Sequence, residues 1–174
     1  MNSIIKFNKK QTFDYIFYSL IIFVGIIIDQ LTKWISATYL SKIITLPIIK
    51  NVIHLTYVEN RGAAFGMFAN NRWVFMITST IMIIGLLLYL YLGLAENRLY
   101  EISMAMIISG GIGNMIDRIA LGYVVDFIDF RLINFAVFNG ADSFVCVGAG
   151  LLILAMVLDM VKEAKSKDEE SADK

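Results

Sequence analysis

Cysteine, histidine and proline are nearly absent from this sequence of 174 residues, which contains one of each. A single cysteine excludes an internal disulfide, and with one histidine it leaves no credible zinc cluster. The histidine, His54, lies in a strand-like stretch, so neither a Ser-His-Asp nor a Cys-His catalytic set is indicated. Cys146 lies in an apolar run, and we interpret it as a buried packing residue. We therefore expect neither a metal nor another cofactor.

Charge is also scarce, and it is balanced. The 15 basic and 15 acidic residues cancel, which indicates no nucleic-acid-binding surface. Only 17% of residues are charged and 58% are hydrophobic, whereas soluble domains have about 25% charged and about 45–50% apolar residues. The apolar residues here form long runs, which favours a membrane protein.

Long apolar runs predict the membrane topology. A bilayer core about 30 Å thick requires about 20 helical residues, and four windows qualify: 15–34, 73–94, 102–119 and 141–161. The sequence predicts an all-α integral membrane protein with four transmembrane helices. Residues 1–164 would form a single membrane-embedded domain, and the charged segment 165–174 a disordered tail. Lysines cluster before the first window, which favours cytoplasmic termini.

The segment between the first two windows has a different pattern. Residues 53–58 alternate apolar and polar side chains in the manner of a half-buried strand, and Pro47 breaks the apolar run before them. We expect a small extramembrane β-sheet here, on the outer face if both termini are cytoplasmic.

Polar residues of the predicted spans gather at one end of the helices. An even number of spans places the end of the first, the end of the third and the start of the fourth on the same membrane face. Ionisable groups within a span cost at least about 2.5–3.5 kcal/mol each, so they mark functional sites. The residues on this face are Asp29, Lys33, Asn60, Arg61, Asn114, Asp117, Arg118, Asp126, Asn139 and Asp142.

Each group in this set also has a structural interpretation. Asp29 and Lys33 are four residues apart, so they could form a salt bridge at the end of the first span. Residues 114, 117 and 118 share one helix face and could form an interhelical polar network, close to glycines that permit close helix contact. Asp126 could be a solvated loop carboxylate. Asp142 could cap the fourth helix together with Asn139.

Two aspartates are nevertheless sufficient to hydrolyse a peptide bond. Neighbouring carboxylates do not both ionise easily, so the pair shares one proton. The ionised partner takes a proton from water, which attacks the carbonyl. The protonated partner hydrogen-bonds the carbonyl oxygen and later supplies the leaving amine with a proton.

Five blocks of residues carry a family resemblance: 29–33, 60–65, 110–118, 122–127 and 138–143. With these blocks in order, the chain resembles lipoprotein signal peptidase (signal peptidase II), a family of bacterial membrane aspartic proteases. The resemblance implies that Asp126 and Asp142 are the catalytic pair. It also implies structural support from Asp29, Lys33 and Asp117. The residues that it implies bind substrate or support the site are Asn60, Arg61, Gly110, Asn114, Arg118, Asn139 and Ala141.

The resemblance also implies the biological setting. The substrates would be prolipoproteins that carry diacylglycerol on a cysteine, cleaved just before that cysteine. The enzyme would be a monomer in the bacterial cytoplasmic (inner) membrane, in contact with membrane lipids. Its termini would be cytoplasmic, and its active site near the outer face.

Two other classes of protein remain as alternatives. A small transporter or channel could line a polar path with acids, but it should distribute them across the bilayer depth. A noncatalytic membrane assembly factor should tolerate isosteric Asp→Asn changes.

Overall fold

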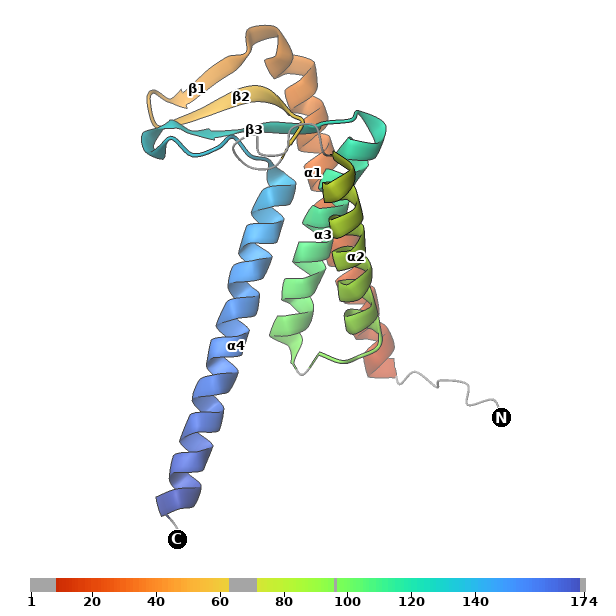
Figure 1. Ribbon diagram of the computed structural model, residues 1–174, viewed down its shortest axis with the longest axis vertical. Helices are drawn as coiled ribbons and strands as arrows, with labels where there is room; N and C mark the ends of the chain where they lie inside the picture. The colour runs from red at the N-terminus through yellow and green to blue at the C-terminus, as the bar shows by residue number, and fades with distance from the viewer. Residues whose placement is uncertain (1–8, 63–71, 96, 173–174) are drawn as a thin grey trace, which may run out of the picture.

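The computed structural model describes residues 9–62, 72–95 and 97–172. They form helices α1 (Lys9–Ile43), α2 (Arg72–Tyr91), α3 (Arg98–Ala120) and α4 (Gly140–Ala172), with strands β1 (Thr45–Ile49), β2 (Ile53–Asn60) and β3 (Val124–Phe130) and the short 3-10 helix η2 (Arg131–Ile133). The helices run roughly side by side, and the sheet lies across one end of them (Figure 1). The protein is therefore mostly helical with one small sheet, as the sequence predicts.

Three described helices are long and apolar enough to cross a bilayer, within Thr12–Ile43, Arg98–Ala120 and Gly140–Glu169. Helix α2 has a shorter apolar stretch, Met76–Tyr91. The expected windows 15–34, 73–94, 102–119 and 141–161 each fall on one of the four helices, apart from the last residues of the second window. The count of four spans remains a prediction.

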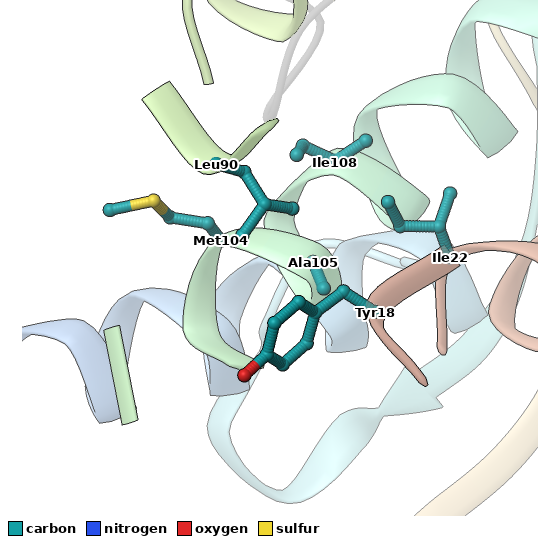
Figure 2. Packing of buried hydrophobic residues seen from close by; sticks show 6 residues of the cluster. All are labelled: Tyr18, Ile22, Leu90, Met104, Ala105 and Ile108. Carbon is teal, nitrogen blue, oxygen red and sulfur yellow. The ribbon is translucent and has the colours of Figure 1, made fainter. Parts of the chain in front are cut away.

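Helix α3 lies at the centre of the helical part and packs against the other three helices. Its contact with α1 and α2 is a buried apolar cluster of Tyr18, Ile22, Leu90, Met104, Ala105 and Ile108 (Figure 2). Its contact with α4 depends on glycine: a Cβ added to Gly110 would collide with the backbone oxygen of Ala141, and one on Gly148 would lie 2.8 Å from the oxygen of Ser103. The small residues therefore let α4 approach α3 closely from its first turn to Gly148.

The predicted strand at 53–58 is the centre of the sheet. β2 pairs antiparallel with β1 on one side and β3 on the other, in the order β1-β2-β3. Pro47, which we expected to break the apolar run before this strand, lies within β1, where the register shifts between Pro47 and Ile49. Proline is tolerated there because β1 is an edge strand.

The end of the chain differs from the expectation of a disordered tail. Helix α4 continues through Ala172 and includes the first eight residues of the segment 165–174. The sequence from Lys162 onward is rich in Lys, Glu and Ala, which are strong helix formers. Glu163 and Lys167 are four residues apart, as are Lys165 and Glu169, and such pairs support a helix.

Candidate active site

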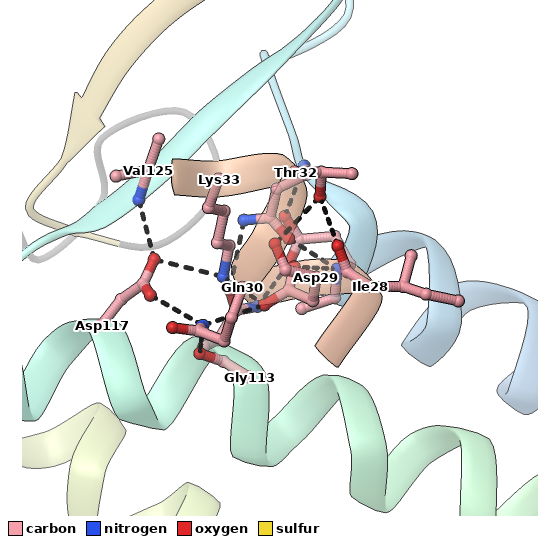
Figure 3. Close-up of polar contacts among 12 residues, drawn as sticks. Ile28, Asp29, Gln30, Thr32, Lys33, Gly113, Asp117 and Val125 are labelled. Carbon is pink, nitrogen blue, oxygen red and sulfur yellow. Dashed lines mark hydrogen bonds and ion pairs between the residues drawn. The ribbon is translucent and has the colours of Figure 1, made fainter. Parts of the chain in front are cut away.

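A buried ionic cluster joins α1 to α3 beneath the sheet (Figure 3). Lys33 Nζ lies 2.9 Å from Asp29 Oδ2 and 3.2 Å from Asp117 Oδ2, and it donates to Asn114 Oδ1 at 2.9 Å. The charged side chains are at most 4% exposed. The salt bridge expected between Asp29 and Lys33 is therefore present, and it extends to Asp117 of α3. Charges this deeply buried are tolerated only when paired and hydrogen-bonded.

The two carboxylates of this cluster each bind one backbone N–H. Asp29 Oδ1 accepts from the N–H of Ala141 at 2.7 Å, and Asp117 Oδ2 accepts from that of Val125 at 3.1 Å. Ala141 directly precedes Asp142, and Val125 directly precedes Asp126. The ionic cluster thereby fixes the first turn of α4 and the start of β3 relative to each other.

Gln30 completes the cluster, although sequence reasoning did not single it out. Its amide nitrogen donates to Asp117 Oδ1 at 3.0 Å and to the carbonyl oxygen of Gly113 at 3.1 Å. Gly113 is needed beside it, because an added Cβ would lie 2.5 Å from Asp29 Oδ2. The polar face of α3 and the second half of α1 are thus held together.

Asp126 lies in β3 and is 1% exposed. Its Oδ1 accepts a hydrogen bond of 2.6 Å from Asn139 Nδ2, and its Oδ2 accepts one of 2.9 Å from Asn60 Nδ2. Burial, followed by the charge of Asp142, raises the pKa of Asp126 to about 6, against the lowering effect of the two amides. The interpretation of Asp126 as a solvated loop carboxylate is therefore wrong.

Asp142 lies in the first turn of α4, and the capping interpretation is correct for it. Its backbone N–H donates to Asn139 Oδ1 at 3.0 Å, and its Oδ2 accepts from the backbone N–H of Asn139 at 3.2 Å. This reciprocal pair is a capping box. The other carboxylate oxygen, Oδ1, accepts from Asn114 Nδ2 at 2.7 Å. Capping thus fixes the carboxylate in one orientation and does not exclude a role in chemistry.

The two acids line one cavity of about 500 Å³, which lies between the sheet, the last turns of α3 and the first turns of α4. The side chains of Asn114 and Asn139 hydrogen-bond to each other at 3.1 Å and join the acids into one network. The lining residues are Asn60, Gly62, Asn114, Arg118, Val124, Asp126, Phe135, Ala136, Val137, Phe138, Asp142, Ser143, Cys146 and Val147. The polar groups gather around the acids, and apolar side chains form much of the remaining wall.

Several residues predicted for the site do not line this cavity. Arg61 forms an exposed ion pair with Glu59 at 3.0 Å and lies over the ring of Tyr123 at 5.5 Å. Gly110 and Ala141 form the close contact between α3 and α4, so they support the site without lining it.

Sequence reasoning missed much of the apolar wall. Cys146, which we expected to be buried, is exposed and lines the cavity. Its position four residues after Asp142 was the available signal, because residues four apart share a helix face. The wall residues at 135–137 follow η2 in an irregular segment, and no sequence pattern marks them.

Comparison with known proteins first defines the class. Two solved structures of bacterial membrane enzymes, determined by the in meso method, have the same fold. One has a TM-score of 0.76 and 32% identity over 82% of this chain and 88% of that one, and the other a TM-score of 0.72 and 33% identity over 80% and 91%.

The sequence model of Signal peptidase (SPase) II matches residues 21–158. The lipoprotein signal peptidase of Caldanaerobacter subterraneus subsp. tengcongensis is 52% identical over 76% of this chain and 90% of its own length. The lipoprotein signal peptidase of Halalkalibacterium halodurans is 39% identical over 89% of this chain and 99% of its own length. The chain belongs to the signal peptidase II family. Membership indicates a protease of lipoprotein processing and confirms the resemblance seen in the sequence blocks.

Proposed function

We propose that this protein is an aspartic endopeptidase that removes signal peptides from diacylglyceryl-modified prolipoproteins, cleaving before the lipidated cysteine. The observation that carries the proposal is that Asp126 and Asp142 line one cavity and are joined by the amides of Asn114 and Asn139. The charge of Asp142 also contributes to raising the pKa of Asp126, as expected for two acids that share a proton.

In the proposed reaction the pair holds one proton and titrates as a unit. The ionised carboxylate accepts a proton from water while the water oxygen bonds to the scissile carbonyl carbon. The protonated carboxyl donates to the carbonyl oxygen, which becomes the hydroxyl of a tetrahedral intermediate. Collapse of the intermediate breaks the C–N bond: the amine leaves with the proton that water gave up, and a hydroxyl of the intermediate returns a proton to the carboxylate that had donated one, which regenerates the pair.

The polar residues in and beside the cavity would position the acids and the substrate. Asn60 and Asn139 hold the two oxygens of Asp126, and Asn114 holds Asp142. Arg118 also lines the cavity, and its guanidinium supplies a positive charge near both acids. Such fixed donors favour the charge that develops during peptide hydrolysis because they need not reorganise.

The membrane setting is part of the proposal. Four helices would span the bacterial inner membrane, with both termini cytoplasmic and the sheet and cavity at the outer face. The enzyme would act as a monomer among membrane lipids. A substrate that carries acyl chains gains about 0.8 kcal/mol per buried methylene, so it would be concentrated in the bilayer and arrive laterally. The clustering of polar groups at one end argues against a transporter, which needs them across the bilayer depth.

The test is cleavage by the purified protein of one precursor prepared with and without diacylglycerol on its cysteine. The expected result is a single product beginning at the lipidated cysteine, identified by mass spectrometry, with the unmodified precursor left intact. Equal cleavage of both precursors, or cleavage at another bond, would contradict the proposed substrate class. Failure of the folded protein to cleave either precursor would contradict the proposed function.

A further inference from the structure

Large apolar side chains are exposed at the end of the sheet that lies away from α1. The turn between β1 and β2 and the helix η2 meet here, since the N–H of Leu132 donates to the carbonyl oxygen of Val52 at 3.4 Å. We call this the sheet tip and define it as Ile48, Ile49, Lys50, Leu132 and Ile133. Leu132 is 70% and Ile133 68% exposed, and Ile48 and Ile49 are more than half exposed.

The sheet tip is held in a fixed shape. Arg131, the first residue of η2, donates from Nε to Asp129 Oδ2 at 2.9 Å and from a terminal nitrogen to Thr45 Oγ1 at 3.1 Å, which ties η2 to both β3 and β1. Asn134 ends η2 in the left-handed conformation, with φ 49°, and turns the chain back. The apolar side chains are therefore presented by ordered backbone, and their exposure is not a consequence of a loose loop.

The sheet tip lies to the side of the point where α4 begins. Phe138, the residue before the cap of α4, pairs with Ile128 of β3. β3 continues for two residues beyond Ile128, which is about 7 Å at the rise of a strand, and Leu132 follows in η2. The tip thus extends sideways from the point where α4 begins, and Figure 1 shows this end of the sheet overhanging that point.

The apolar surface continues from the tip toward the helices. Phe135, in the segment that returns to α4, is half exposed, and Val147 on α4 is also exposed. Lys50 lies exposed in the β1–β2 turn, beside the apolar side chains. Apolar groups bordered by a cation match the chemistry of a bilayer surface, which offers acyl chains below and phosphates above.

We propose that the sheet tip inserts into the lipid surface of the leaflet on the cavity side of the membrane, with Leu132 and Ile133 among the acyl chains and Lys50 at the phosphates. The tip would then anchor the sheet at a fixed height above the bilayer. This proposal does not depend on the catalytic role of the aspartates.

The test uses fluorescent labelling of single cysteines in the full-length protein, with Cys146→Ala in every variant. An environment-sensitive nitrobenzoxadiazole group is attached at Leu132→Cys, Ile133→Cys and, as matched control, Lys42→Cys near the end of α1. Each protein is reconstituted into vesicles of phosphatidylcholine and phosphatidylglycerol, with or without lipids that carry a doxyl quencher at the top of the acyl chain. The control position is exposed, and Figure 1 places the end of α1 beyond the sheet.

The expected result is blue-shifted emission at 132 and 133 and quenching at least about twofold stronger than at 42, since interfacial apolar groups lie about 5–10 Å into the boundary of headgroups and acyl chains. Equal weak quenching at all three positions would place the tip in water and overturn the proposal. A blue shift at 132 and 133 without quenching by lipid would show that protein, such as a second copy of the chain, covers the tip, and would overturn it equally.

Discussion

Lys33 is the residue whose replacement tests the buried ionic cluster most severely. It is 3% exposed and neutralises two carboxylates, at 2.9 Å from Asp29 and 3.2 Å from Asp117. Lys33→Met keeps most of the side chain's volume but leaves both acids buried without a cation. Removal of one partner of a buried ion pair costs about 3–5 kcal/mol, and here two acids lose the same partner. At about 2–4 °C per kcal/mol for a protein of this size, the unfolding midpoint should fall by about 6–20 °C.

The assay is thermal unfolding of the purified protein in detergent, followed by tryptophan fluorescence. The matched control is Lys42→Met, which changes an exposed lysine of the same helix and should leave the midpoint nearly unchanged. Lys33→Met should also reduce cleavage, because Asp29 and Asp117 hold the backbone on either side of the cavity. Equal midpoints for the two variants would refute the argument that the cluster stabilises the fold.

Three further predictions concern single positions. Burial raises the pKa of Asp126 from 3.8 to about 6, so the folded protein holds this proton more tightly than the unfolded chain. The free energy of unfolding of wild type should therefore fall by about 3 kcal/mol relative to that of Asp126→Asn as pH rises from about 4 to about 6. Unfolding midpoints of the two proteins that change in parallel with pH would contradict this. Gly113→Ala places a Cβ 2.5 Å from a carboxylate oxygen of Asp29 and should cost about 1–3 kcal/mol, whereas Gly85→Ala, which meets nothing within 4 Å, should be harmless in the same thermal assay. Asn97→Ala removes a side chain that caps α3 through two N–H groups and should lower stability by about 0.5–2 kcal/mol, measured by chemical unfolding; an unchanged midpoint would show that the cap is dispensable.

Local patterns in the sequence predicted several elements because local physics decides them. The alternation at 53–58 became the central strand, and the spacing of Asp29 and Lys33 gave the ion pair. Asn139 and Asp142 formed the capping box that their separation by three residues suggested. These features depend on neighbours in the chain and on little else. The concentration of polar groups at one end of the helices was predicted differently, from the even number of expected spans.

Features that depend on distant contacts were not predictable in the same way. The hydrogen bonds that the backbone N–H groups of Ala141 and Val125 donate to Asp29 and Asp117 require the tertiary arrangement, and no sequence spacing encodes them. β3 has side chains buried on both faces, so its sequence lacks the alternation that marks β2. The cavity wall after η2 has no periodicity at all.

The most direct test of the proposed chemistry compares three aspartates of one region in the same cleavage assay. Asp126→Asn and Asp142→Asn each change a carboxylate that lines the cavity. Asp129 lies in β3 with Asp126 but outside the cavity, where it binds Thr56 and Arg131, so Asp129→Asn is the matched control. With diacylglyceryl-modified precursor, the first two variants should fold and show no cleavage above background, and Asp129→Asn should retain activity. Turnover by folded Asp126→Asn or Asp142→Asn would contradict catalysis by the aspartate pair.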